Sequence, residues 1–169
     1  MRPWNGIRRT AILVALSILA LDQVSKAWIE RMLPVGGKRE VIPGFFNLTH
    51  IRNDGVAFGL FAGSDGRWKV WLLAALALVA IAVVISLIRN TPTSNRLSIL
   101  ALGLVLGGAL GNLLDRLASG AVTDFLDFYR GGYHWHNFNV ADSAISVGVT
   151  LLLLDSLVLS RRNPRAPRP

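Results

Sequence analysis

The segment VWLLAALALVAIAVVISLI (residues 70–88) has 19 residues and carries no charged side chain. A helix of that length rises about 28 Å, which is close to the roughly 30 Å hydrocarbon core of a bilayer. The whole chain agrees with this pattern, because 52% of its 169 residues are hydrophobic and its mean hydropathy is +0.46. We therefore expect a membrane protein whose fold is built around this helix.

Three further segments have the composition of membrane spans, at about residues 10–29, 97–114 and 140–159. The first begins with a 12-residue apolar run after a basic start, a pattern that resembles a signal peptide. No small-residue cleavage site follows, however, and the apolar pattern continues through Trp28 and Ile29, so a helix is favoured. In the third segment Gly103, Gly107 and Gly111 recur every four residues, a spacing that lets a neighbouring helix approach closely.

The polar sequence between the first two spans, about residues 30–69, is too long for a simple turn. FFNLTHIRN (residues 45–53) has the composition of a half-buried strand, and Asn53-Asp54-Gly55 is a strong turn signal. We expect a membrane α-helical fold: one integral domain with four transmembrane helices and a small extracytoplasmic loop region that contains β-structure. The basic, proline-rich tail, about residues 161–169, is predicted to be disordered.

The formal net charge of +8 raises the question of nucleic acid. The basic residues flank apolar segments instead of forming one polar face, so membrane topology explains them better. Four spans place both termini on one side, and the positive-inside rule makes that side cytoplasmic. Its short segments hold no acid and nine arginines: Arg2, Arg8, Arg9, Arg89, Arg96, Arg161, Arg162, Arg165 and Arg168.

Carboxylates next to apolar, membrane-spanning sequence cost free energy, so each of them is a candidate functional residue. Asp22, Asp115, Asp124 and Asp142 all fall at the predicted outer membrane boundary. Asp22 and Lys26 lie one helical turn apart, which fits either a snorkelling ion pair or a functional role.

Asp124 lies on the otherwise apolar face of a strand-like segment, VTDFLDF (residues 122–128). Asp142 has a plain structural explanation, because Asn139 as N-cap and Asp142 three residues later resemble a capping box. Taken together, the two aspartates suggest a catalytic dyad. Like charges a few ångströms apart cannot both ionise easily, so one carboxyl keeps a proton. The ionised member can then draw a proton from water while the protonated one hydrogen-bonds a scissile carbonyl.

Five sequence blocks, in order and spacing, closely resemble those of the bacterial lipoprotein signal peptidases (signal peptidase II): DQVSK (22–26), NDGVAF (53–58), GGALGNLLDR (107–116), VTDFLDF (122–128) and FNVADSAISVG (138–148). The resemblance implies an aspartic endopeptidase of the bacterial inner membrane. Such an enzyme removes signal peptides from diacylglyceryl-modified prolipoproteins and cuts before the lipid-modified cysteine.

Carried over position by position, the resemblance makes Asp124 and Asp142 the catalytic pair. It implies supporting or substrate-binding roles for Asp22, Lys26, Asn53, Gly55, Gly108, Asn112, Asp115, Arg116 and Asn139. The expected partners are prolipoproteins and membrane lipids, without nucleic acid, and the expected oligomeric state is a monomer.

Two other classes of function predict different arrangements of these residues. In an ion or proton transporter the carboxylates would be spread across the bilayer, yet here Asp155 alone lies toward the inner side. In a metalloprotease the ligands would come from His134 and His136, but this pair lacks the helical HExxH arrangement and His50 offers no clear third ligand. The chain has no cysteine, and we expect neither a metal nor another cofactor.

Overall fold

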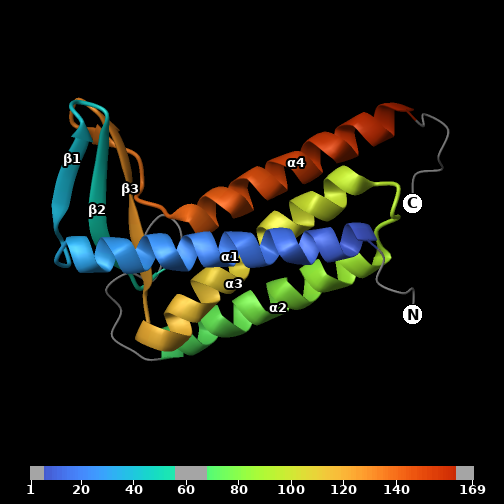
Figure 1. Cartoon of the computed structure of the whole chain (residues 1–169), viewed down its shortest axis with the longest axis horizontal. Coiled ribbons are helices and arrows are strands. Elements are labelled where there is room, and N and C mark those ends of the chain that lie inside the picture. Colours follow the sequence, from blue (N-terminus) through green and yellow to red (C-terminus); the bar gives the residue numbers. More distant parts are fainter. Residues whose placement is uncertain (1–5, 56–67, 163–169) are drawn as a thin grey trace.

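The computed structural model describes residues 6–55 and 68–162, with side chains as far as residue 157. Within these residues there are four helices long and apolar enough to cross a membrane. Figure 1 shows them as an elongated bundle with the strands at one end. The helices are α1 (Gly6–Met32), α2 (Trp68–Asn90), α3 (Arg96–Ser119) and α4 (Val140–Arg162). The predicted fold class is thereby confirmed, and the chain is a multi-pass membrane protein.

Each helix extends beyond the apolar segment from which it was predicted, because polar helix ends reach past the hydrocarbon core. The ends of α3 show how the sequence stops it. Asn95 is the N-cap, and its side chain accepts a hydrogen bond from the Ser98 backbone N–H. Gly120 closes the helix in the left-handed conformation (φ 78°), and its N–H donates to Arg116. Glycine takes this conformation without the Cβ clash that other residues meet.

Helix α3 is the centre of the bundle, because it packs against each of the other three helices. The predicted close approach is confirmed at its glycines. A Cβ on Gly103 would lie 2.7 Å from the Ala11 carbonyl oxygen, and one on Gly107 would lie 2.6 Å from that of Ala15. Gly108 faces the start of α4 in the same way, with 2.4 Å to the Ala141 oxygen. Small residues thus let α1 and α4 lie with their backbones against α3.

Outside these glycine contacts, the bundle is held by an apolar cluster between α2, α3 and α1: Ala15, Ala74, Ile81, Val84, Ile88, Leu102, Leu106 and Leu113. Many large apolar side chains point outward instead, among them Leu13, Leu76 and Leu153, whose exposed fractions are 62%, 56% and 62%. In a bilayer these outer faces contact lipid.

The strands form one antiparallel arrangement in the order β1 (Lys38–Ile42), β2 (Phe46–Asn53), β3 (Val122–Arg130), β4 (Tyr133–His134). The strand predicted at residues 45–53 is confirmed as β2. The small sheet does not belong to the first loop alone, however, because β3 and β4 come from the connection between α3 and α4. Strand pairing joins residues about 70 to 80 positions apart here, as in Asn53 with Val122 and Phe46 with Phe128. A single sequence does not encode such pairing in its local pattern.

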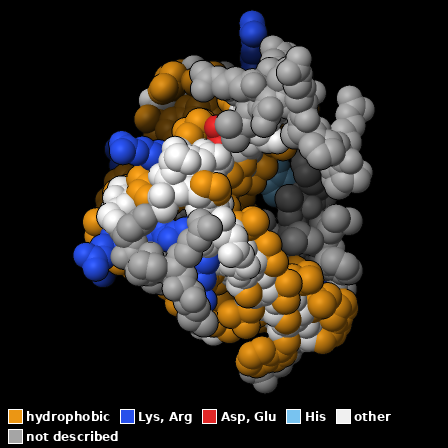
Figure 2. Space-filling model, turned by 90° about the vertical axis from the view of Figure 1, so that its right-hand side faces the viewer, with side chains coloured by type: hydrophobic (Ala, Val, Ile, Leu, Met, Phe, Trp, Pro, Cys, Tyr) orange, Lys and Arg blue, Asp and Glu red, His pale blue; other side chains and the backbone are white. Residues whose placement is uncertain are grey.

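At the opposite end of the bundle, Lys and Arg side chains gather around the helix ends (Figure 2). Arg8 belongs to this end but is only 2% exposed. Its guanidinium donates to the carbonyl oxygens of Ile88 (3.1 Å), Arg89 (2.9 Å) and Thr91 (3.2 Å). These carbonyls lie where α2 ends and has no further helical N–H groups to offer them. Arg8 therefore joins the start of α1 to the end of α2.

Replacing Gly108 with alanine should destabilise the bundle. The new methyl group would lie 2.4 Å from the Ala141 oxygen and 2.8 Å from Ile145 Cγ1, so α4 must move away from α3. Overpacking of this kind costs about 1–3 kcal/mol. Thermal unfolding of purified protein in detergent should show a lower Tm for Gly108→Ala. Gly6→Ala is the control, because nothing lies within 4 Å of a Cβ there. Equal Tm values for the two variants would contradict the tight α3–α4 contact.

Candidate active site

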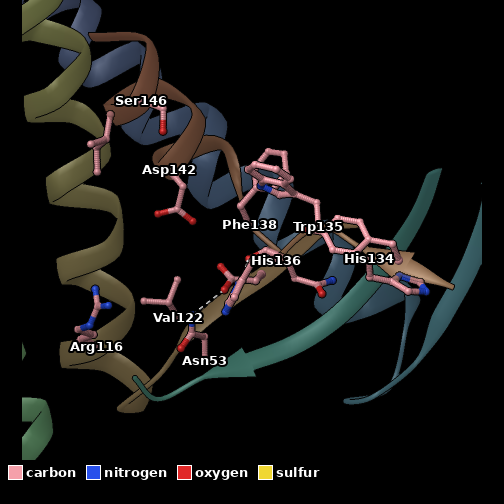
Figure 3. A pocket seen from close by; sticks show the side chains of 13 residues that line it. Asn53, Arg116, Val122, His134, Trp135, His136, Phe138, Asp142 and Ser146 are labelled. Atoms are coloured by element: carbon pink, nitrogen blue, oxygen red, sulfur yellow. Dashed lines mark hydrogen bonds between the residues drawn. The ribbon is translucent and has the colours of Figure 1, made fainter. Parts of the chain in front are cut away.

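A pocket of about 630 Å³ opens where the sheet meets the helices (Figure 3). Thirteen residues line it, and they come from the end of β2, from α3, from β3, from β4 and the connection after it, and from the first turns of α4. Asp124 and Asp142 both line this pocket. The fold therefore brings the two aspartates singled out in the sequence to one cavity.

Asp124 is 2% exposed, and both of its carboxylate oxygens accept hydrogen bonds. Asn53 donates from Nδ2 to Oδ2 at 2.9 Å, the contact drawn as a dashed line in Figure 3. Asn139 donates from Nδ2 to Oδ1 at 2.7 Å. Burial raises the pKa of Asp124 from 3.8 to about 6; the negative charge of Asp142 adds to the rise, and the amide donors and Lys26 oppose it. Asp124 thus holds its proton to a higher pH than its ordinary pKa would allow.

Asp142 lies in the first turn of α4, and the predicted cap is present. Its backbone N–H donates to Asn139 Oδ1 at 2.9 Å, and the Asn139 N–H donates to Asp142 Oδ2 at 3.3 Å. The second carboxylate oxygen, Oδ1, accepts from Asn112 Nδ2 at 2.8 Å. Capping uses one oxygen of Asp142 and leaves its carboxylate on the pocket, so the structural and the chemical interpretations are compatible.

Asn139 is fully buried and connects the two aspartates. Its amide nitrogen binds Asp124, while its amide oxygen accepts from the Asp142 backbone. Because one rigid amide makes both contacts, the distance between β3 and the start of α4 is fixed by this side chain. The sequence identified Asn139 as a cap, and the structure adds its contact with Asp124.

Asn112 is oriented by its neighbours. Its Oδ1 accepts from Lys26 Nζ at 3.2 Å and from Asn139 Nδ2 at 3.3 Å, which turns its NH₂ group toward Asp142. Lys26 in turn lies 2.7 Å from Asp22 and 2.7 Å from Asp115. The snorkelling interpretation of Lys26 is wrong, because Lys26 and Asp22 are 3% and 0% exposed. They form a buried network between α1 and α3, since a buried charge is tolerated only when it is paired.

The same network reaches the start of α4 and the strand β3. Asp22 Oδ1 accepts from the Ala141 N–H at 2.9 Å, where the positive end of the helix dipole favours a carboxylate. Gln23 donates to Asp115 at 2.9 Å. Thr123, next to Asp124, donates to Glu30 at 2.7 Å. Gln23, Glu30 and Thr123 were not identified from the sequence, because only the folded chain places them together.

Arg116 lines the pocket and holds the turn after β2. It donates to the Gly55 carbonyl at 3.3 Å and to the Asn112 carbonyl at 3.2 Å. The Gly55 N–H donates to Asn53 Oδ1 at 3.0 Å, which leaves the Asn53 NH₂ group directed at Asp124. The remainder of the NDGVAF block, residues 56–58, lies outside the described residues.

The histidines of the HWH sequence make separate contacts. His134 Nδ1 lies 2.8 Å from Asp127 Oδ1, and His136 Nδ1 lies 3.0 Å from the Asn137 carbonyl oxygen. In the described part of the chain, no three His, Cys, Asp or Glu side chains are grouped so that they could hold a metal ion. Asp155 is near the other end of α4, where Ser98 donates to it.

Fold and pocket together define the class: a multi-pass membrane protein with an acidic site where its helices meet a small sheet. Residues 14–158 match the family model described as signal peptidase (SPase) II, a family of aspartic proteases, and the chain belongs to this family. The lipoprotein signal peptidase of Solibacter usitatus is 46% identical over 151 residues, which cover 89% of this chain and 92% of the relative. That of Burkholderia thailandensis is 43% identical over 157 residues, which cover 93% and 89%.

Two solved structures have a similar fold. One, described as a bacterial membrane enzyme determined by the in meso method at 2.3 Å resolution, has a TM-score of 0.82 and 32% identity, with 95% of this chain and 94% of that chain covered. A second, at 1.9 Å resolution, has a TM-score of 0.77 and 34% identity.

The raised pKa of Asp124 predicts a carboxyl group that titrates near pH 6. Because the pKa lies above its ordinary value, Asp124 takes up its proton as the pH falls through about 6. In protein labelled with ¹³C at aspartate carboxyls, NMR should show this titration. Asp142→Asn should lower the midpoint by removing the neighbouring charge, and Asp124→Asn should abolish the signal. A midpoint that does not move in Asp142→Asn would show that the two groups do not interact.

Proposed function

We propose that this chain removes the signal peptide from prolipoproteins by hydrolysing the bond before a diacylglyceryl-modified cysteine, with Asp124 and Asp142 as the catalytic pair. The observation that carries the assignment is the shared pocket, in which one buried amide, Asn139, contacts both aspartates. The names of the relatives supply the substrate class.

The reactive form of the pair holds one proton, on Asp124, whose burial raises its pKa to about 6. Ionised Asp142 takes a proton from a water molecule as the water oxygen bonds to the scissile carbonyl carbon. Asp124 gives its proton to the carbonyl oxygen, which yields a neutral tetrahedral diol. Asp142 then donates its proton to the amide nitrogen, and Asp124 recovers one from a diol hydroxyl. The carbon–nitrogen bond breaks, one water is consumed, and both carboxyls return to their starting states.

The surrounding amides hold the pair for this exchange. Asn53 and Asn139 donate to Asp124, and Asn112 donates to Asp142, so each carboxylate has a fixed orientation. The buried Asp22–Lys26–Asp115 network supports Asn112 and the start of α4 from behind. Alignment of reacting groups contributes much of the rate in such chemistry. We assign these residues, with Gly55, Gly108 and Arg116, to positioning of the pair or of the substrate.

The placement of the site suits a substrate that is itself a membrane helix. The pocket lies where helices with apolar outer faces meet the sheet, at the end of the bundle opposite the basic end. This position supports a site at the membrane–water boundary. Exposed Trp28, Trp68, Trp71 and Trp135 fit an interfacial belt. One chain supplies both aspartates of the pocket, which supports a monomer. We place the enzyme in the bacterial inner membrane, with cytoplasmic termini and the active site near the outer face.

Asp124→Asn and Asp142→Asn should each remove cleavage of a diacylglyceryl-modified prolipoprotein peptide, by roughly 10²-fold or more. Asparagine keeps the size of the side chain but cannot exchange protons. Asp155→Asn is the matched control at the other end of α4, where the aspartate contacts Ser98, and it should cleave at the wild-type rate.

Asp142→Glu separates capping from catalysis, since glutamate is well tolerated at the third position of a helix. It should preserve the Tm and still lose cleavage, because one added methylene misaligns the pair. Wild-type cleavage by folded Asp142→Asn would refute the catalytic role and leave Asp142 as a cap.

Reporter fusions test the orientation. A green fluorescent protein fused to the C-terminus should fluoresce, and alkaline phosphatase inserted after Gly44, in the exposed turn between β1 and β2, should be active. The expected result follows from the arginines at the basic end of the bundle. An inactive phosphatase at Gly44 combined with an active one at the C-terminus would reverse the topology.

A further inference from the structure

One side of the pocket is a single continuous segment, residues 133–138, all six of which are among the lining residues. We call it the pocket wall. The wall begins with β4 and ends directly before Asn139. Its first two residues pair with β3 as β4. Further along, Trp135 N donates to the Phe128 carbonyl at 2.8 Å, and Phe138 and Leu126 exchange backbone hydrogen bonds at 3.2 and 2.9 Å. Its position relative to the aspartates therefore depends on how it is attached to this strand.

Side chains add a further attachment on the other face of the sheet. Along β3, Asp124, Leu126 and Phe128 share one face, and Asp127 and Tyr129 share the other, because successive side chains alternate. His134 at the start of the wall belongs with the second set. Its Nδ1 lies 2.8 Å from Asp127 Oδ1, and its ring stacks on Tyr129 at 5.0 Å between centroids. The wall is thus fixed from the face opposite the catalytic aspartate.

Asp127 is a buried carboxylate, 3% exposed, that plays no part in the proposed dyad. Its two oxygens have different donors: Asn47 Nδ2 on β2 at 2.7 Å and His134 Nδ1 at 2.8 Å. Asn47 makes this contact at a cost, since its own Oδ1 is buried without a hydrogen-bond partner. The opposite amide orientation would set an oxygen against the carboxylate. Asp127 therefore connects the fixed strand β2 to the wall.

Charged and titratable side chains next to this connection attach it to β1. Tyr129, which supports the His134 ring, donates its hydroxyl to Glu40 and accepts from the Gly44 N–H at 2.9 Å. Lys38 lies 5.3 Å from the centre of the Tyr129 ring. The polar side chains of all four strands consequently converge on the base of the wall.

We propose that Asp127 and His134 are positioning residues for substrate binding. Their contact holds the pocket wall in place and thereby sets the width of the pocket that the substrate chain occupies beside the aspartates. The inference rests on the proposed active site. Neither residue contacts the catalytic carboxylates, which have their own amide donors in Asn53, Asn112 and Asn139. Loosening the wall should therefore weaken binding and leave the chemical step almost unchanged. His134 keeps the contact either as a cation or as the neutral tautomer that carries its proton on Nδ1.

Three variants test the contact. His134→Ala removes the donor. His134→Asn places an amide N–H near the position of Nδ1 and should retain it. Asp127→Asn has only one acceptor oxygen, so it cannot accept from both Asn47 and His134. Arg130→Ala, an exposed residue of the same hairpin, is the control. With a fluorescent diacylglyceryl-modified prolipoprotein peptide, His134→Ala and Asp127→Asn should raise KM by roughly two- to tenfold, the range expected for a lost hydrogen bond, with kcat within about twofold.

His134→Asn and Arg130→Ala should keep the wild-type KM. The double variant of His134→Ala and Asp127→Asn should be no worse than either single one, because both remove the same contact. Binding measured in an Asp124→Asn background separates this inference from the dyad: the Kd of the uncleaved peptide should rise with His134→Ala and recover with His134→Asn.

Three results would overturn the proposal: a fall in kcat with unchanged KM, additive losses in the double variant, or failure of His134→Asn to restore binding. A dyad assignment that fails would appear differently, as persistent cleavage by Asp124→Asn with the KM effects of His134 intact. Tm values of every variant identify those that fail to fold, and for these the binding comparison between His134→Ala and His134→Asn decides.

Discussion

The backbone contact between Gly108 of α3 and Ala141 at the start of α4 is the constraint on which the site depends. A Cβ at Gly108 would lie 2.4 Å from the Ala141 oxygen, so only glycine lets the two helices come this close. Asn112 follows one helical turn after Gly108, and Asp142 follows Ala141. The close approach therefore brings the Asn112 amide within 2.8 Å of Asp142. A helix held further away would separate this amide from the Asp142 carboxylate, which would lose a hydrogen-bond donor.

The charges buried between α1, α3 and α4 follow from the same geometry. Lys26 is shared by Asp22 and Asp115, and Asp22 also receives the Ala141 N–H. Ion pairs of this kind are poor sources of net stability, because desolvation offsets most of their attraction. Their value here is orientation: the network accepts only one rotation of α1 and one position for the start of α4. It thereby supports the Asn112 amide, which contacts Asp142.

The two faces of strand β3 carry aspartates with different roles. Asp124 faces the pocket, where burial raises its pKa to about 6. Asp127, three residues later, faces away and holds His134 and Asn47. The two aspartates have similar burial but different partners, so their environments assign one to proton transfer and the other to the placement of the pocket wall. An aspartate-rich strand of this composition does not reveal that division by itself.

The sequence by itself determined the features that depend on neighbouring residues. Hydrophobicity over about 20 residues identified all four helices, the four-residue glycine spacing predicted the close face of α3, and the Asn139–Asp142 spacing predicted the cap.

Tertiary structure alone decided which distant groups meet. The sequence does not predict the pairing of β2 with β3, the contact of Asp22 with Ala141 across 119 positions or the burial of Lys26. The sequence leaves open whether Lys26 snorkels, because an i, i+4 pair has the same pattern on an exposed face as on a buried one. The contact of His134 with Asp127 was missed because alternation identifies the face of a strand and not its neighbour. Local patterns follow from the period of the helix or strand, whereas these contacts follow from the packing of whole helices and strands, which no short window of sequence contains.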